Sequence, residues 1–220
     1  MKKTILSLAL LAGLTSAAQA QTGLKLGLKG GFNGSTFSGS DSKGSEYKAG
    51  FAAGGLLNYG FTDKFSVQGE LLYSQKGASQ DKVSYVSGTS TTGVPTIAND
   101  GTAKITLGYI DVPVLLKVNT GEDGKGFYFE VGPQGSFILH QRTFLENGSG
   151  KQVGSSGTST DAFNKAVIGY VGGLGYQITS GVGVGVRYTG DISQVYKDNL
   201  GGNLHNSVFQ FQAHYLFGGK

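Results

Sequence analysis

The sequence predicts an all-β protein: an eight-stranded antiparallel transmembrane β-barrel with up-and-down meander topology, preceded by a cleavable N-terminal signal peptide. Three observations support this prediction: an export signal, short segments in which apolar and polar residues alternate, and connections that alternate between long and short. Alternation with a period of two indicates strands. Short and long connections that alternate around an even number of strands are typical of outer-membrane barrels.

The first twenty residues have the features of a secretory signal peptide. Lys2 and Lys3 form a basic start, residues 5–14 form an apolar centre, and Ala18-Gln19-Ala20 is a small-residue cleavage site. The apolar run is too short to span a membrane as a helix. We therefore expect this segment to be removed and residues 21–220 to form one barrel domain; a retained N-terminal anchor is the alternative.

The composition argues against several other classes of protein. The chain of 220 residues contains 39 glycines, 3 prolines and 24 tyrosines and phenylalanines, which is too aromatic for a disordered chain. Without the signal peptide, 16 basic and 14 acidic residues remain, and the basic ones are scattered, so nucleic acid is not an expected partner. Cysteine is absent, so an exported chain would have no disulfides.

Eight segments are predicted to be strands, and most reach the ~9–11 residues that a tilted membrane strand needs. They are residues 24–32, 47–61, 65–77, 105–118, 127–142, 166–178, 182–188 and 207–217. Long polar connections follow the first, third, fifth and seventh segments, and short turns follow the second, fourth and sixth. We expect the short turns and both termini on the periplasmic side and the long loops outside.

The third strand, FSVQGELLYSQKG, shows how the faces should point. Phe65, Leu71 and Tyr73 share one face, while Gln68 and Glu70 lie on the other. In a membrane barrel the apolar face contacts lipid and the polar face lines the lumen. Leu71→Arg should therefore abolish insertion, whereas Glu70→Gln should be comparatively mild.

Aromatic residues near the strand ends predict two interfacial girdles. Near the short turns these are Tyr59, Phe61, Phe65, Phe127, Phe129, Tyr176, Tyr215 and Phe217; near the long loops they are Phe32, Tyr47, Tyr73, Tyr109, Phe137, Tyr188 and Phe209. Four aromatic residues of the last strand form the predicted signal for the barrel-assembly machinery: Phe209, Phe211, Tyr215 and Phe217.

The lumen of an eight-stranded barrel is only wide enough for side chains to fill. The charged residues predicted to fill it are Lys25, Lys29, Glu70, Asp111, Lys117, Glu130 and Arg187. Charged groups persist in such a space only if they are paired or hydrated. We therefore expect a packed polar network rather than a conduit.

Five segments resemble strands of a known family: GLKGGFN, FSVQGELLYSQKG, YIDVPVLLKV, FYFEVGPQGSFIL and GVGVRYTGDIS. They are similar to the PorT-like "outer membrane protein beta-barrel domain" family, common in Bacteroidetes, and the likeness covers nearly the whole mature chain. Relatives usually carry Glu where this chain has Asp111. The resemblance implies an eight-stranded outer-membrane barrel; the namesake is an accessory of a secretion apparatus, but most relatives have no defined activity.

Neither a catalytic nor a metal site is expected. Simple alternation places His140 on the lumen face near the outer rim, with Ser136 on the same face. Four strand residues separate the two by over ~13 Å, so they cannot pair as nucleophile and base. Three scattered histidines without cysteine do not give metal-ligand spacing, and no cofactor is implied.

The expected role is therefore structural or interactive, in the outer membrane, and non-enzymatic. Expected partners are outer-membrane lipid, the barrel-assembly machinery during biogenesis, and possible envelope proteins that contact the loops. The second loop carries Tyr85, Val86 and Val94, although a flexible tether is favoured there over a recognition element. Alternatives are a narrow porin or small-ligand transport barrel, an accessory of a protein-secretion apparatus, and a soluble periplasmic binding barrel with an apolar lumen.

Overall fold

The computed structural model describes residues 23–156, 158–178, 181–197 and 202–217. The predicted signal peptide, residues 1–20, lies outside the described residues. In the described part of the chain, no helix is long and apolar enough to cross a membrane.

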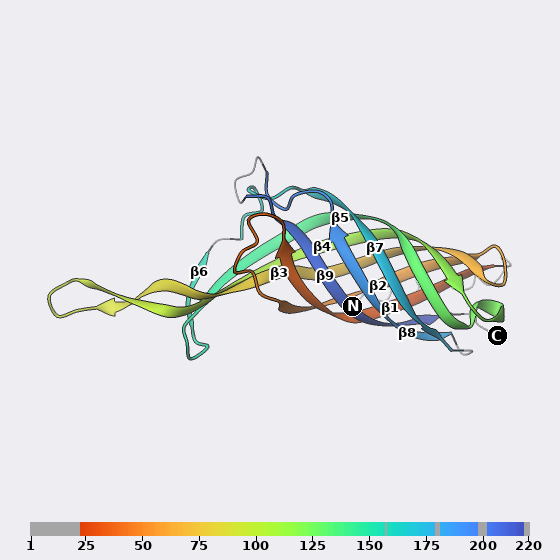
Figure 1. The fold of residues 1–220 in the computed structure, drawn as a ribbon, viewed down its shortest axis with the longest axis horizontal. Coiled ribbons are helices and arrows are strands. Elements are labelled where there is room, and N and C mark those ends of the chain that lie inside the picture. Colours follow the sequence, from red (N-terminus) through yellow and green to blue (C-terminus); the bar gives the residue numbers. More distant parts are fainter. Residues whose placement is uncertain (1–22, 157, 179–180, 198–201, 218–220) are drawn as a thin grey trace, which may run out of the picture.

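Eight antiparallel strands form a closed ring (Figure 1). They are β1 (Leu24–Ser38), β2 (Lys48–Gly60), β3 (Phe65–Thr89), β4 (Pro95–Asn119), β5 (Gly126–Glu146), β7 (Ala166–Gln177), β8 (Val182–Asp191) and β9 (His205–Leu216). Each strand pairs with the next one of the ring, and pairing of β1 with β9 closes it. The predicted eight-stranded meander is confirmed.

Two further elements lie outside this ring. β6 (Gln152–Ser156) pairs with the end of β5 and extends it as a short hairpin. A single 3₁₀ turn, η1 (Glu122–Gly124), lies in the connection between β4 and β5. The sequence pattern did not predict β6, because its residues are polar and glycine-rich and read as a loop.

The second loop is a long β-hairpin, so the prediction of a flexible tether was wrong. β3 and β4 each have 25 residues, and they continue together beyond the barrel wall (Figure 1). Residues 81–101, which we call the outer hairpin, pair only with each other among the described residues. Register shifts begin after Gln80, and Lys82 has a φ of 59°. These irregularities interrupt the alternation that sequence patterns detect.

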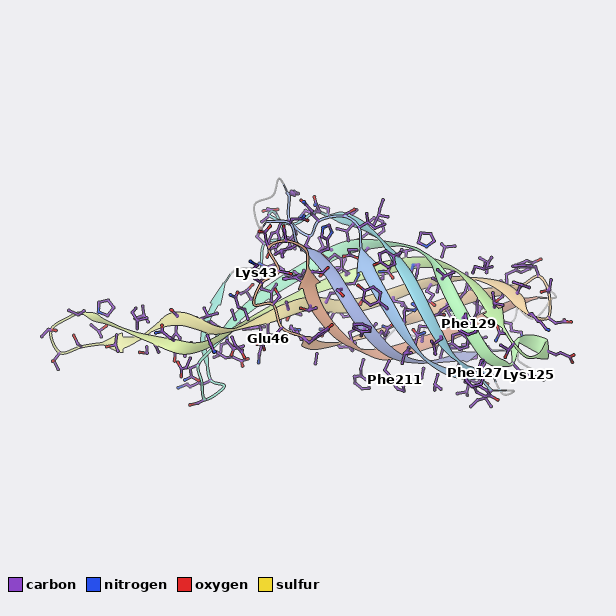
Figure 2. The ribbon with its side chains drawn as sticks, viewed as in Figure 1. Lys43, Glu46, Lys125, Phe127, Phe129 and Phe211 are labelled. Carbon is purple, nitrogen blue, oxygen red and sulfur yellow. The ribbon has the colours of Figure 1, made fainter. Side chains whose placement is uncertain are left out.

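The outer surface of the ring is apolar. Phe65, Val67 and Leu71 of β3 are exposed, whereas Gln68 and Glu70 are buried. The same inversion holds on β9, where Phe211 is exposed and Gln212 is buried (Figure 2). A polar inside and an apolar outside are opposite to the arrangement predicted for a soluble binding barrel and match a barrel that faces lipid.

Two predicted placements were wrong. A bulge in β5 pairs Gly108 with His140 and Tyr109 with Ile138, so His140 joins Leu139 on the outer face instead of facing the lumen. The His140 ring consequently lies outside, 3.0 Å from the hydroxyl of Tyr73. Tyr109 was predicted in the outer aromatic girdle, but it is fully buried inside the barrel because its strand register points it into the lumen.

Candidate functional site: the barrel lumen

An ion network occupies the middle of the lumen. Arg187 of β8 forms two contacts with Glu70 of β3, Nη1 to Oε2 at 2.8 Å and Nη2 to Oε1 at 2.9 Å, and its Nη2 lies 2.7 Å from Glu130 Oε1. Lys29 of β1 lies 2.5 Å from Glu70 Oε1. All four side chains are at most 2% exposed. Buried charges need this kind of mutual pairing to offset the loss of hydration.

Neutral amides complete the central network. Gln68 Nε2 donates to Glu70 Oε1 at 2.6 Å, and Gln212 Nε2 donates to Glu130 Oε1 at 2.9 Å. With these two residues the network includes side chains from β1, β3, β5, β8 and β9. Each carboxylate therefore accepts bonds from both charged and uncharged donors.

A second ion cluster lies closer to the long loops. Lys76 Nζ is 2.9 Å from Asp111 Oδ1 and 4.0 Å from Asp191 Oδ1, and it donates to Ser136 Oγ at 3.0 Å. Asn206 Nδ2 donates to Asp191 Oδ2 at 2.7 Å. Asp111 therefore belongs to this second cluster. The sequence pattern had placed it in one set with the residues of the central network.

The lumen below the central network holds Lys117 and His214. Lys117 Nζ lies 3.4 Å from Gln177 Oε1 and 3.9 Å from the centre of the Tyr128 ring. His214 Nε2 lies 2.6 Å from Gln177 Oε1. Lys25, the last of the predicted lumen residues, is half-buried and lines the mouth at the short-turn end.

The charges inside the described lumen balance. Four buried cations, Lys29, Lys76, Lys117 and Arg187, face four buried carboxylates, Glu70, Asp111, Glu130 and Asp191. A neutral interior lacks the single-sign lining that selects and attracts ions in charged pores. The balance therefore favours mutual neutralisation over ion conduction.

Sequence reasoning missed Lys76 and Asp191. Lys76 continues the polar face of Glu70 and Ser74 at two-residue spacing, so the alternation itself contains the signal. Asp191 continues the series Arg187 and Thr189, but the predicted strand ended at Tyr188 and left Asp191 in a loop. Extending each alternation to its last polar member would have found both residues.

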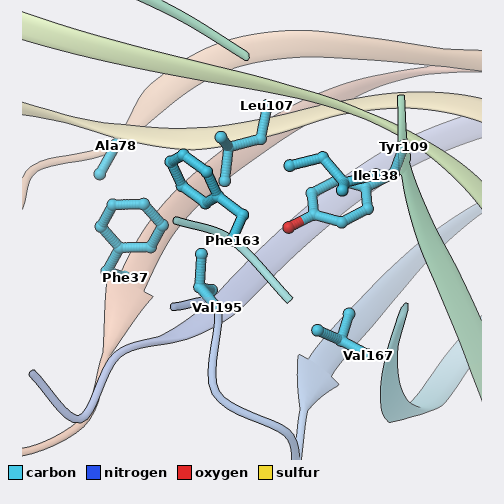
Figure 3. Packing of buried hydrophobic residues seen from close by; sticks show 8 residues of the cluster. All are labelled: Phe37, Ala78, Leu107, Tyr109, Ile138, Phe163, Val167 and Val195. Atoms are coloured by element: carbon cyan, nitrogen blue, oxygen red, sulfur yellow. The ribbon is translucent and has the colours of Figure 1, made fainter. Parts of the chain in front are cut away.

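An apolar cluster closes the lumen at the long-loop end (Figure 3). Phe163 and Val195 come from the connections that precede β7 and follow β8, and they pack with Phe37, Leu107 and Tyr109 of the wall. The backbone of Asn164 bonds Val195 at 2.9 Å, which ties the two connections together. A purely polar filling was expected, but these inward-folded loop residues make the outer end of the described lumen apolar.

Little space remains between these layers. A cavity of about 10 Å³ lies between the two ion clusters, lined by Lys76, Asp111, Gln134 and Arg187 among others. This volume is at the lower limit for a single water molecule. A larger cavity of about 380 Å³ opens at the short-turn end and has Lys117 among its lining residues.

The residues of the predicted insertion signal lie on the outside of the last strand. Phe209, Phe211 and Tyr215 are exposed on β9. Phe217 follows the strand; its N–H donates to the carbonyl of Leu26 at 2.7 Å, and its ring contacts Tyr215 edge-on with centroids 5.2 Å apart. The last strand is thus held to the first one at the short-turn end, near Lys125 and Phe127 in Figure 2.

Ser136 and His140, the two residues weighed as nucleophile and base, lie on opposite faces of the barrel wall. Ser136 accepts from Lys76 inside the lumen, whereas His140 contacts Tyr73 outside it. Across the described residues, no three His, Cys, Asp or Glu side chains form a group that could hold a metal ion.

The comparison with protein families decides the classification. Residues 18–196 match the family model described as outer membrane protein beta-barrel domain. The chain belongs to this family. It is therefore an integral outer-membrane β-barrel, and the apolar outer band of this family member is its lipid-facing surface. Among curated proteins, none matches its sequence significantly.

Several solved outer-membrane barrels resemble this family member at low sequence identity. Ail of Yersinia pestis, crystallised with the heparin analogue sucrose octasulfate, is 12% identical, with 89% of this chain and 100% of Ail covered and a TM-score of 0.49. Neisserial surface protein A is 14% identical, with coverage of 86% and 96% and a TM-score of 0.48. OprG of Pseudomonas aeruginosa is 14% identical, with coverage of 90% and 98% and a TM-score of 0.38.

Proposed function

We propose that this protein is a non-enzymatic outer-membrane barrel with a closed lumen, whose role is structural and interactive. The observation that supports the closed lumen is the central network of Lys29, Glu70, Glu130 and Arg187, which are buried in the lumen and come from four strands of the ring. The apolar cluster around Phe163 adds a second barrier above it. A solute would have to break several buried ion pairs and displace the cluster to pass.

The rival function is a narrow channel or a small-ligand transport barrel. Liposome swelling separates the two, because small sugars or amino acids that cross the barrel draw water into the vesicle. We expect swelling no faster than in protein-free vesicles, with a general porin as the positive control. Swelling that scales with the amount of folded barrel would contradict the proposal.

The interactive part of the proposal rests on the outer hairpin. Its strands have unpaired edges in the described part of the chain, and Val86, Val94 and Ile97 are exposed on it. Unpaired strand edges can accept an added strand from a partner. The PorT-like resemblance makes a component of a secretion apparatus one candidate partner, alongside other envelope proteins.

Site-specific photo-crosslinking in cells tests this role. A photoreactive residue at Val86 or Ile97 should give a discrete protein adduct, whereas the same residue at Lys165, exposed on another connection at the long-loop end, should not. Adducts of equal yield at all three positions, or none at the hairpin, would contradict an interaction through the outer hairpin.

A further inference from the structure

Among the charged residues that line the cavity at the short-turn end, lysines outnumber acidic residues. The cavity has a volume of about 380 Å³, and Lys25, Lys64, Lys117 and Lys125 line it together with one acidic residue of the described lining, Asp63. Glu122 lies on the neighbouring turn but does not line the cavity. A concave surface of one charge concentrates counter-ions. The cavity, which we call the basic vestibule, is therefore suited to anions.

Lys117 lies at the inner end of the basic vestibule with an incomplete set of partners. Its ammonium has three donors, but the hydrogen bond to Gln177 is long at 3.4 Å, and the Tyr128 ring supplies only a face. The carboxylate opposite it in the β4–β5 register, Glu130, is engaged by Arg187 and Gln212. N–H donors of the buried Lys117 ammonium group therefore remain available to a ligand.

The other buried cations of the described lumen differ from Lys117 in this respect. Lys29, Lys76 and Arg187 each have a carboxylate within 2.9 Å. Lys117 is only 2% exposed, yet within the described residues no carboxylate lies within 4.0 Å of its Nζ. A buried cation without a counter-ion is costly. The lumen charges balance as a whole, but an anion in the vestibule would give Lys117 a counter-ion in direct contact.

We propose that the basic vestibule binds a phosphate group, with Lys117 at its floor and Lys25 and Lys64 at its rim. Lysine ammonium groups bind phosphate as point charges. The cavity volume admits a phosphate with its first substituent, whether the group is free phosphate or the headgroup of a phospholipid in the inner leaflet. The ion network above Lys117 stops the anion from passing further, so the site is a binding pocket with one opening.

Calorimetric titration with inorganic phosphate, at constant ionic strength in an uncharged detergent, tests binding of the free anion. We expect saturable binding to the folded barrel. Lys117→Met and Lys25→Gln should each weaken it by about tenfold, the effect of losing one charge-assisted contact. Lys104→Gln is the matched control, because Lys104 pairs with Glu146 at the other end of the barrel. The phosphate affinity of this variant should equal that of the wild type.

Native mass spectrometry of the barrel from phosphatidylglycerol nanodiscs tests the lipid source. Retention of lipid by the wild type and loss of that lipid in Lys25→Gln would assign the site to lipid headgroups. Saturable binding of inorganic phosphate without any retained lipid would assign it to the free anion. Lys25→Gln and Lys64→Gln change rim residues, so they give an answer even if Lys117→Met does not fold. The proposal would be overturned if the wild type bound neither inorganic phosphate nor phosphatidylglycerol, or if the wild type and all variants bound them equally well.

Discussion

Arg187 and Glu70 form a two-bonded ion pair across the lumen, between strands β8 and β3 that are not neighbours in the ring. Glu70 also contacts Lys29, so one carboxylate holds two cations, which come from β1 and β8. This geometry revises the expectation from sequence that Glu70→Gln would be mild. The carboxylate is shared, and its neutralisation leaves more than one buried charge undercompensated.

We predict that Glu70→Gln lowers the free energy of unfolding by about 3–5 kcal/mol, the usual cost of breaking a buried ion pair from one side. Adding Lys29→Met should restore part of the loss, because Arg187 keeps Glu130 as its partner. Urea unfolding in lipid vesicles measures both effects. A loss below about 1 kcal/mol for Glu70→Gln would mean that the pair is hydrated or absent.

Leu71→Arg tests the lipid-facing surface. Leu71 is 60% exposed on the outer face of β3, and an arginine at the membrane midplane costs about 2–4 kcal/mol in a barrel of this kind. We expect less folded barrel, seen as loss of the heat-modifiable band on gels. The control is Val86→Arg, on the outer hairpin beyond the ring, which should insert normally.

Phe217→Asp tests the predicted insertion signal. The substitution keeps the backbone bond to Leu26 but removes the ring contact with Tyr215. We expect reduced folded barrel in the outer membrane while refolding of purified protein in detergent is nearly unchanged. That split would separate recognition by the assembly machinery from stability. Equal levels of wild type and variant in cells would refute a role for Phe217 in recognition.

Gly185→Val tests how tightly the lumen is packed. A Cβ at Gly185 would lie 2.5 Å from the Tyr128 hydroxyl oxygen and 2.7 Å from the Leu174 carbonyl oxygen. Overpacking of this kind costs about 1–3 kcal/mol. Gly172→Val is the control, since nothing lies within 4 Å of a Cβ there. Equal unfolding midpoints in urea for the two variants would indicate a loosely filled lumen.

The sequence predicted the ring well because the period-two alternation depends on the difference between lipid and lumen, which acts on every strand. It failed where that difference ends or is interrupted. The bulge near Leu139 moved His140 outside, and the outer hairpin continues where neither lipid nor lumen imposes a pattern. The pairing of Lys76 with Asp111 depends on the register between the neighbouring strands β3 and β4, which the alternation within each strand does not encode.

The apolar cluster could not be predicted for a similar reason. Phe163 and Val195 lie in connections whose apolar residues do not alternate regularly with polar ones, and only their inward path makes them part of the lumen. An isolated apolar residue in a loop has no periodicity to mark it. The closed state of the outer end is thus a property of the folded loops.

Ion conductance across a planar bilayer tests the closed lumen most directly. The purified barrel should insert, as shown by protection of its membrane strands from protease, without producing steps of current at either polarity. Persistent single-channel steps from the wild type, abolished when the protein is unfolded before reconstitution, would contradict a lumen closed by the central network and the apolar cluster.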